Sequence, residues 1–115
     1  MGKTYLVNAF SLNMIKQFPI GISVNKIDKE WFCFNLNADP QVVNAIGHDS
    51  TVYLINKLCG TNFQKNRIEV KMSRGDSTLV IMISERLPEG KVLNQEEIEE
   101  MLVKGKIGFY EVMIL

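Results

Sequence analysis

The spacing of apolar residues along this 115-residue chain changes between the period of strands and the period of helices. Apolar positions at every second residue, in segments rich in β-branched and aromatic side chains, predict strands. The predicted strands are 4–10, 19–24, 66–72, 78–84 and 107–115. Residues 73–77 (SRGDS) have turn chemistry and predict a hairpin between the third and fourth of these strands.

Capping residues mark the helices of the first half of the chain. Residues 11–14 are typical of a turn that enters a short helix, and Asp28 is a candidate N-cap for the next one. We expect the inner face of that second helix to carry Trp31, Phe32 and Phe34. Asp39-Pro40 then favours a further short helical element that ends at Gly47, because proline is preferred at the first helical position.

Two more helices follow. One begins at about Ser50 and ends before Gly60, which is a plausible C′ residue, with an apolar face formed by Val52, Ile55, Leu58 and Cys59. The other begins at Asn94, which with Glu97 resembles a capping box, and ends at Gly105. This interleaved order predicts an α/β chain of mixed α+β type, a single domain over residues 1–115. We expect a roughly five-stranded mixed sheet flanked by three or four helices.

Composition excludes some classes of function. The formal net charge is zero, which disfavours a general duplex DNA binder, although a few local cations would suffice for a small anionic ligand. No apolar run reaches about 18 residues and no signal pattern begins the chain, so we expect a soluble intracellular protein without a membrane partner. Cys33 and Cys59 lack metal-type spacing and lie in apolar helical patterns, which favours buried free thiols over a zinc site.

The stretch Gly47-His48-Asp49-Ser50-Thr51 carries the strongest candidate chemistry. It holds the only histidine at an expected helix start, where free N–H groups and a partial positive charge suit a phosphate. Histidine moves protons readily near neutral pH, so the stretch predicts a phosphodiester held in front of a proton donor. The ordinary alternative is a histidine that serves only the turn or the cap.

Three further clusters place polar side chains at element ends. Asn8, Ser11 and Asn13 follow the first strand, at the kind of sheet edge where ligands bind. Arg67, in the run 64–67, could clamp a phosphate. Each cluster also has an ordinary interpretation as turn chemistry or a solvated loop.

The charged loop 85–91 is the last of these clusters. Its Gly90 could act as a hinge that closes the loop over a ligand. Arg86 could pair with a phosphate, and Glu89 could orient a histidine or a ribose hydroxyl. The alternative is a surface turn with a local ion pair worth about 0–1 kcal/mol.

Together these clusters resemble a known family. The segments that carry the resemblance, in order, are 8–11 (NAFS), 46–51 (IGHDST), 58–61 (LCGT), 64–67 (QKNR) and 86–91 (RLPEGK). They are similar to those of the viral anti-CRISPR ring nucleases, which degrade the cyclic tetra-adenylate made by type III CRISPR systems. The resemblance extends from Lys3 to Tyr110, and the IGHDST and QKNR runs are long enough to be specific.

The resemblance implies a function and a set of site residues. The implied activity is metal-independent cleavage of the ring to linear di-adenylate, through attack of a ribose 2′-hydroxyl on the adjacent phosphorus, with no cofactor. It implies that His48 is the general acid and that Arg86 and Glu89 contact the reacting phosphate and the histidine. The remaining positions, which hold bases, riboses and phosphates in the family, are Asn8, Ser11, Asn13, Ser50, Thr51 and Arg67.

The resemblance also implies a setting. A homodimer would bind one ring across its two-fold axis, because a ring of four identical nucleotides has a matching axis. The place of action would be the cytoplasm of the infected host cell, where destroying the messenger suppresses type III CRISPR signalling.

The chain departs from the family pattern at three positions. Glu85 replaces a common glutamine, Met82 replaces a polar residue found in some relatives, and Pro88 stands where glutamate is frequent. We expect the Glu85 carboxylate to face solvent or to pair with Lys91, because it would repel an anionic ligand.

Two other functions compete with the enzyme. A non-catalytic protein could sequester the cyclic oligoadenylate as a sponge, although a sponge would not need His48 as an acid. A small viral structural or nucleic-acid-binding protein is the third hypothesis, and the zero net charge argues against its duplex-binding form.

Overall fold

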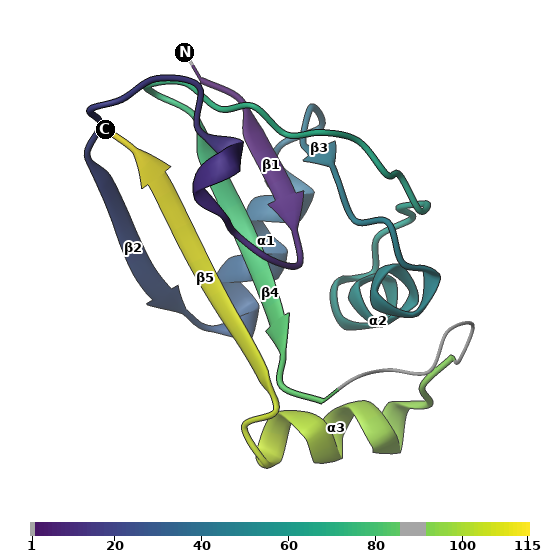
Figure 1. Ribbon diagram of the computed structural model, residues 1–115. Coiled ribbons are helices and arrows are strands. Elements are labelled where there is room, and N and C mark those ends of the chain that lie inside the picture. The colour runs from purple at the N-terminus through teal and green to yellow at the C-terminus, as the bar shows by residue number, and fades with distance from the viewer. Residues whose placement is uncertain (1, 86–91) are drawn as a thin grey trace.

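The computed structural model describes residues 2–85 and 92–115, which form one domain of the α+β class. Five strands build its sheet: β1 (Thr4–Val7), β2 (Ile22–Ile27), β3 (Val43–Asn44), β4 (Ser77–Ile83) and β5 (Ile107–Ile114). The helices are α1 (Lys29–Ala38), α2 (Asp49–Cys59), α3 (Gln95–Val103) and the short 3-10 helix η1 (Leu12–Met14). The predicted mixed five-stranded sheet with three or four helices is confirmed (Figure 1).

The sheet has the strand order β2-β5-β4-β1-β3 and joins two kinds of pairing. β1 runs parallel to both β3 and β4, with Leu6 opposite Asn44 on one side and Leu79 on the other. β5 runs antiparallel to β4 and to the edge strand β2. The carboxyl ends of β1, β3 and β4 therefore meet at one end of the sheet, which is where ligands commonly bind in open sheets with parallel strands.

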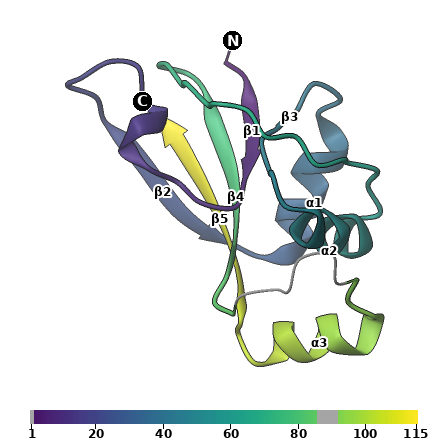
Figure 2. The same ribbon diagram turned by 45° about the vertical axis from the view of Figure 1, so that its right-hand side comes forward.

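The two faces of the sheet are covered differently. The helices cover one face with the larger core, in which Leu6, Phe32, Ile55 and Ile81 are fully buried. η1 lies on the opposite face, as Figures 1 and 2 both show, over a smaller core that includes Tyr5, Ile15 and Val80. The helical layer therefore holds α2, and with it His48, on one side of the sheet.

The helix caps follow the sequence closely. The Asp28 carboxylate accepts a hydrogen bond from the N–H of Trp31 at 2.8 Å, and the capping box of Asn94 and Glu97 is formed. Gly60 ends α2 in the left-handed region, at φ 67°. The predicted inner face of α1 was wrong in part. Phe32 is buried as expected, but Trp31 and Phe34 stack on each other at the surface.

Two predicted elements have a different structure. Residues 66–72 form no ladder: Met72 makes one isolated bridge to Ile15, and Val70 and Met72 pack on the second face instead. Residues 73–77 still turn, through the N–H of Asp76 to the carbonyl of Ser73, but no hairpin results. The helical element predicted to end at Gly47 is also absent from the described residues, because Val43–Asn44 pairs with β1 as β3.

Candidate functional site at the start of α2

His48 is the N-cap residue of α2, which begins at Asp49, one residue before the predicted start at about Ser50. Its backbone is extended, at φ −124° and ψ 125°, and its carbonyl accepts the first helical hydrogen bond from the N–H of Val52 at 3.2 Å. The imidazole makes no capping hydrogen bond and is exposed. An imidazole at this position contributes nothing to the cap and is free to meet a ligand.

The first turn of α2 lies directly behind His48. Ser50 and Thr51 are buried, with 4% and 6% of their surface exposed, so this turn is packed firmly into the fold. The first N–H groups of a helix have no partner inside it, and they carry the positive end of the helix dipole. His48 therefore stands beside a group of backbone donors suited to an anion such as a phosphodiester.

Residues 64–67 run alongside the segment that leads from β3 into α2, and we call them the strap. The Arg67 guanidinium donates to the carbonyl of Gly47 at 3.3 Å, and the Lys65 ammonium lies 3.6 Å from the Asp49 carboxylate. A Cβ on Gly47 would come within 2.9 Å of Arg67 Nε, so a larger residue here would displace the arginine side chain from its present position. The strap thus brings the exposed Arg67 next to the residue that precedes His48.

Asn8 lies at the same end of the sheet. Asn8 is the first residue after β1. Close by, the N–H of Ala45, just past β3, donates to the carbonyl of Leu6 in β1 at 2.9 Å. The parallel pairing of β1 with β3 therefore brings the segment after β1 toward the segment that leads to His48. His48, Ser50, Thr51, Arg67 and Asn8 share this end of the sheet.

Ser11 and Asn13 occupy a different position. Both are exposed, and Asn13 belongs to η1 on the second face, where its carbonyl accepts from the Lys71 ammonium at 2.7 Å. Among the described residues, no hydrogen bond or ion pair joins either one to His48. Arg86 and Glu89, the other two residues expected to be catalytic, lie outside the described residues, as do Pro88 and Lys91.

Two of the departures from the family pattern can be located. Glu85 is exposed to solvent, which is one of the two expected arrangements, and its carboxylate pairs with the Lys106 ammonium at 2.6 Å. The Met82 side chain is half exposed at the end of β4. Within residues 2–85 and 92–115, no three His, Cys, Asp or Glu side chains are grouped to hold a metal ion, and no helix is long and apolar enough to cross a membrane.

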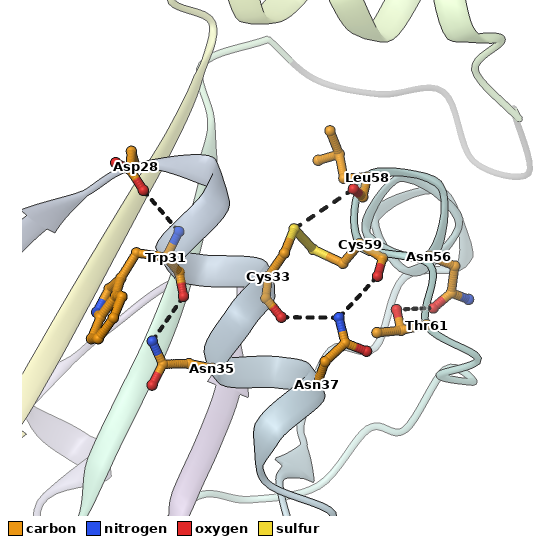
Figure 3. The surroundings of a disulfide bond; sticks show 9 residues. All are labelled: Asp28, Trp31, Cys33, Asn35, Asn37, Asn56, Leu58, Cys59 and Thr61. Carbon is orange, nitrogen blue, oxygen red and sulfur yellow. Dashed lines mark hydrogen bonds between the residues drawn. A yellow bond between two sulfur atoms is a disulfide. The ribbon is translucent and has the colours of Figure 1, made fainter.

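The opposite end of α2 is built quite differently (Figure 3). Cys33 of α1 and Cys59 of α2 form a disulfide, so the expectation of free thiols was wrong. The Asn37 amide donates to the carbonyls of both cysteines, at 3.0 Å each. Both cysteines lie in helical patterns, as expected, but the side-by-side packing of α1 and α2 places them opposite each other, which spacing along the chain did not reveal.

A cavity of about 390 Å³ lies at this disulfide end. Its lining residues, which come from the ends of α1 and α2 and the loops after them, are Leu36, Asn37, Asp39, Pro40, Val42, Gly60, Thr61, Asn62 and Phe63. It includes no lysine or arginine and lies a full helix length from His48. The cavity is therefore separate from the candidate anion site.

Comparison with known proteins places the chain among viral proteins. The family model described as STIV B116-like matches residues 4–111. The chain belongs to the STIV B116-like family. The solved structure of B116 of Sulfolobus turreted icosahedral virus is 57% identical and superposes with a TM-score of 0.92, over 97% of this chain and 99% of that one.

Two similar curated proteins come from filamentous viruses. An uncharacterized protein, ORF116 of Acidianus filamentous virus 1, is 44% identical over 107 residues, which cover 93% of this chain and 91% of that protein. An uncharacterized protein of Sulfolobus islandicus filamentous virus is 28% identical over 101 residues, or 87% of this chain and 72% of the relative. The chain is thus similar to a set of viral proteins whose names assign no activity.

Proposed function

We propose that this member of the STIV B116-like family is a metal-independent ring nuclease that cleaves cyclic tetra-adenylate to linear di-adenylate. The observation that carries the proposal is the exposed imidazole of His48, which occupies the N-cap of α2 without capping it. Serine, threonine, aspartate and asparagine serve an N-cap better, so a histidine here has to be explained by something other than helix stability.

The chemistry suits these residues. In the proposed step, the 2′-oxygen of a ribose attacks the adjacent phosphorus, and the bond from phosphorus to the 5′-oxygen breaks on the opposite side. The 2′-hydroxyl proton leaves to solvent or a base, and His48 protonates the departing 5′-oxygen. The products are a 2′,3′-cyclic phosphate and a 5′-hydroxyl, and two such cuts give two linear di-adenylates.

The proposed reaction also needs groups that neutralise the charge of the phosphate and hold the ring in position. The first-turn N–H groups of α2 and the Arg67 guanidinium can hold the phosphate beside His48, and Asn8 at the end of β1 can hydrogen-bond a base or ribose. Arg86 and Glu89 are assigned to the reacting phosphate and to the histidine by sequence resemblance alone. A homodimer would present two such sites to one two-fold symmetric ring.

The viral relatives support a role against host defence. The related proteins belong to viruses that infect cells, which is the setting in which erasing an immune messenger would be useful. We therefore propose that the protein suppresses type III CRISPR signalling in the cytoplasm of the infected cell.

The test is incubation of the purified protein with cyclic tetra-adenylate in EDTA, resolved by liquid chromatography and mass spectrometry. We expect linear di-adenylate from the wild type, and a turnover lower by about a hundred- to ten-thousand-fold in His48→Ala, with the ring still bound. Lys57→Ala, an exposed change in the last turn of α2, is the control and should cleave normally. Dependence on metal would overturn the metal-free scheme.

Intact ring in every sample would overturn the enzyme. A calorimetric titration would then distinguish a sponge, which binds the ring tightly without cutting it, from a protein with no affinity for it.

A further inference from the structure

We propose that Asn66 and Asn44 are positioning residues for His48, which hold the main chain before α2 in the orientation that the reaction needs. This inference rests on the proposed function of His48. It concerns the strap, whose Asn66 and whose partner Asn44 were not among the predicted site residues.

The two asparagines form a closed set of hydrogen bonds between the strap and the end of β3. Asn44 Nδ2 donates to the carbonyl of Gln64 at 2.6 Å, and Asn66 Nδ2 donates to the carbonyl of Asn44 at 2.7 Å. The N–H of Asn66 donates to the carbonyl of Ile46 at 2.9 Å, and the N–H of Ile46 donates to Asn44 Oδ1 at 3.0 Å. The strap is therefore tied to the chain after β3 by one main-chain hydrogen bond and two bonds from asparagine side chains.

These bonds fix the direction of successive peptide groups. A trans peptide is planar, with its oxygen and its N–H on opposite sides. The carbonyls of Asn44 and Ile46 point to Asn66, so the next N–H groups point the other way; for Ala45 that is toward the carbonyl of Leu6 in β1. The N–H of Gly47 is turned away from the strap by the same geometry.

The last peptide before the histidine is held as well. The Arg67 guanidinium donates a hydrogen bond to the carbonyl of Gly47. The N–H of His48, on the opposite side of the same peptide, therefore points away from that guanidinium. Neither the N–H of Gly47 nor that of His48 donates a hydrogen bond to any of the residues that the structure describes. Two backbone donors next to the imidazole are thus left for a ligand, and the strap determines where they point.

The chain that leads into α2 is anchored in the core at Ile46 and only at the surface near His48. Ile46 is fully buried in the main core, whereas Asn66 and His48 are exposed. Asn66→Ala removes the side-chain bond to the carbonyl of Asn44 and keeps the main-chain bond to Ile46, so it should leave the core packed and loosen the strap beside Gly47 and His48. A shift of about 1 Å at a catalytic group can cost about a hundred-fold in rate, so a weak surface contact can have a large effect on turnover.

The experiment compares Asn66→Ala with Asn37→Ala, an exposed asparagine that donates to two main-chain carbonyls at the other end of α2. We expect kcat for cyclic tetra-adenylate to fall about ten- to a hundred-fold in Asn66→Ala, with KM changed less than about three-fold. Asn37→Ala should keep the wild-type kcat, because its loss affects only the disulfide end. Asn66→Gln, which keeps a side-chain amide donor, should retain part of kcat.

A second readout needs no catalysis. His48 is the only histidine, so its ring resonances in a carbon–proton NMR spectrum can be followed without assignment. We expect these resonances to shift or broaden in Asn66→Ala and to stay in place in Asn37→Ala. Equal kcat values and unchanged His48 resonances in Asn66→Ala would overturn the positioning role. If the wild type did not cleave the ring, the proposed function would fail, and the resonances alone would still decide whether Asn66 positions His48.

Discussion

The two ends of α2 are held by different kinds of interaction. At its C-terminal end, Gly60 adopts the left-handed conformation that closes a helix, and the disulfide between Cys33 and Cys59 ties α2 to α1. Asn56 adds three hydrogen bonds there: Nδ2 donates to the carbonyl of Phe63, and Oδ1 accepts from Thr61 Oγ1 and the N–H of Phe63. This end is built for stability.

At the N-terminal end the first helical turn is buried, but the ties at the surface beside His48 are weaker and more exposed. His48 occupies the cap without a capping bond, and the contacts of the strap there are an exposed ion pair and hydrogen bonds at the surface. Proteins commonly concentrate such unoptimised features where they bind or react. The difference between the ends therefore locates the candidate site at His48, and changes at each end should affect different properties.

The largest effect on stability should come from the disulfide. Replacing both cysteines, Cys33→Ser with Cys59→Ser, opens a covalent loop of 26 residues, and the loop-entropy relation gives a cost of about 3.5 kcal/mol in the free energy of unfolding. Denaturant unfolding of the double variant measures it. Wild-type protein unfolded in excess reductant is the control and should lose a similar amount, while the turnover of the folded protein should be kept.

This comparison also shows what sequence could predict. Local signals were sufficient for the caps at Asp28 and Asn94 and for the helix end at Gly60, because a cap involves residues within one turn of each other. The start of α2 was predicted within one residue, at about Ser50 against the observed Asp49, although His48 was not the expected N-cap. The disulfide could not be found this way, because it depends on α1 and α2 packing side by side.

The segment 66–72 shows another limit of the sequence pattern. Its alternating apolar positions predict a strand, and two of them, Val70 and Met72, are buried. They pack under η1 on the second face, and the backbone has no strand beside it. The roles of Asn44 and Asn66 were hidden likewise, because their hydrogen bonds join residues about twenty positions apart.

A second prediction concerns the hydrogen bonds of Asn56. Asn56→Ala removes all three, and it leaves the partly buried N–H of Phe63 without this acceptor. We expect a loss of about 2 kcal/mol in the free energy of unfolding, with turnover unchanged. Asn62→Ala is the matched control: it changes an exposed asparagine in the same loop and should cost less than about 0.5 kcal/mol. Equal losses in the two variants would show that the hydrogen bonds of Asn56 carry no special stability.

A third prediction concerns the N-terminal end of α2, where a substitution should raise the stability of the protein. His48→Asn places a good capping residue at the N-cap, so the protein should become more stable by about 0.5–1 kcal/mol, while cleavage of the ring should be lost. Thermal and denaturant unfolding measure the first effect, and His48→Ala, which cannot cap, should show no such gain. A clear loss of stability in His48→Asn would mean that the imidazole supports the fold, and the contrast between the two ends would no longer hold.

The smallest effect should come from the ion pair beside the site. Lys65 and Asp49 have side chains that are 51% and 37% exposed, with 3.6 Å between the charged atoms. Solvent and salt screen such a pair, so Lys65→Ala should change the free energy of unfolding by no more than about 0.5 kcal/mol, and less at high ionic strength. A loss as large as that of Asn56→Ala would show that the N-terminal end of α2 is as firmly tied as the other. A small loss of stability together with weaker binding of the ring at low salt would instead indicate that Lys65 attracts the anionic ligand, and that the strap serves the site more than the fold.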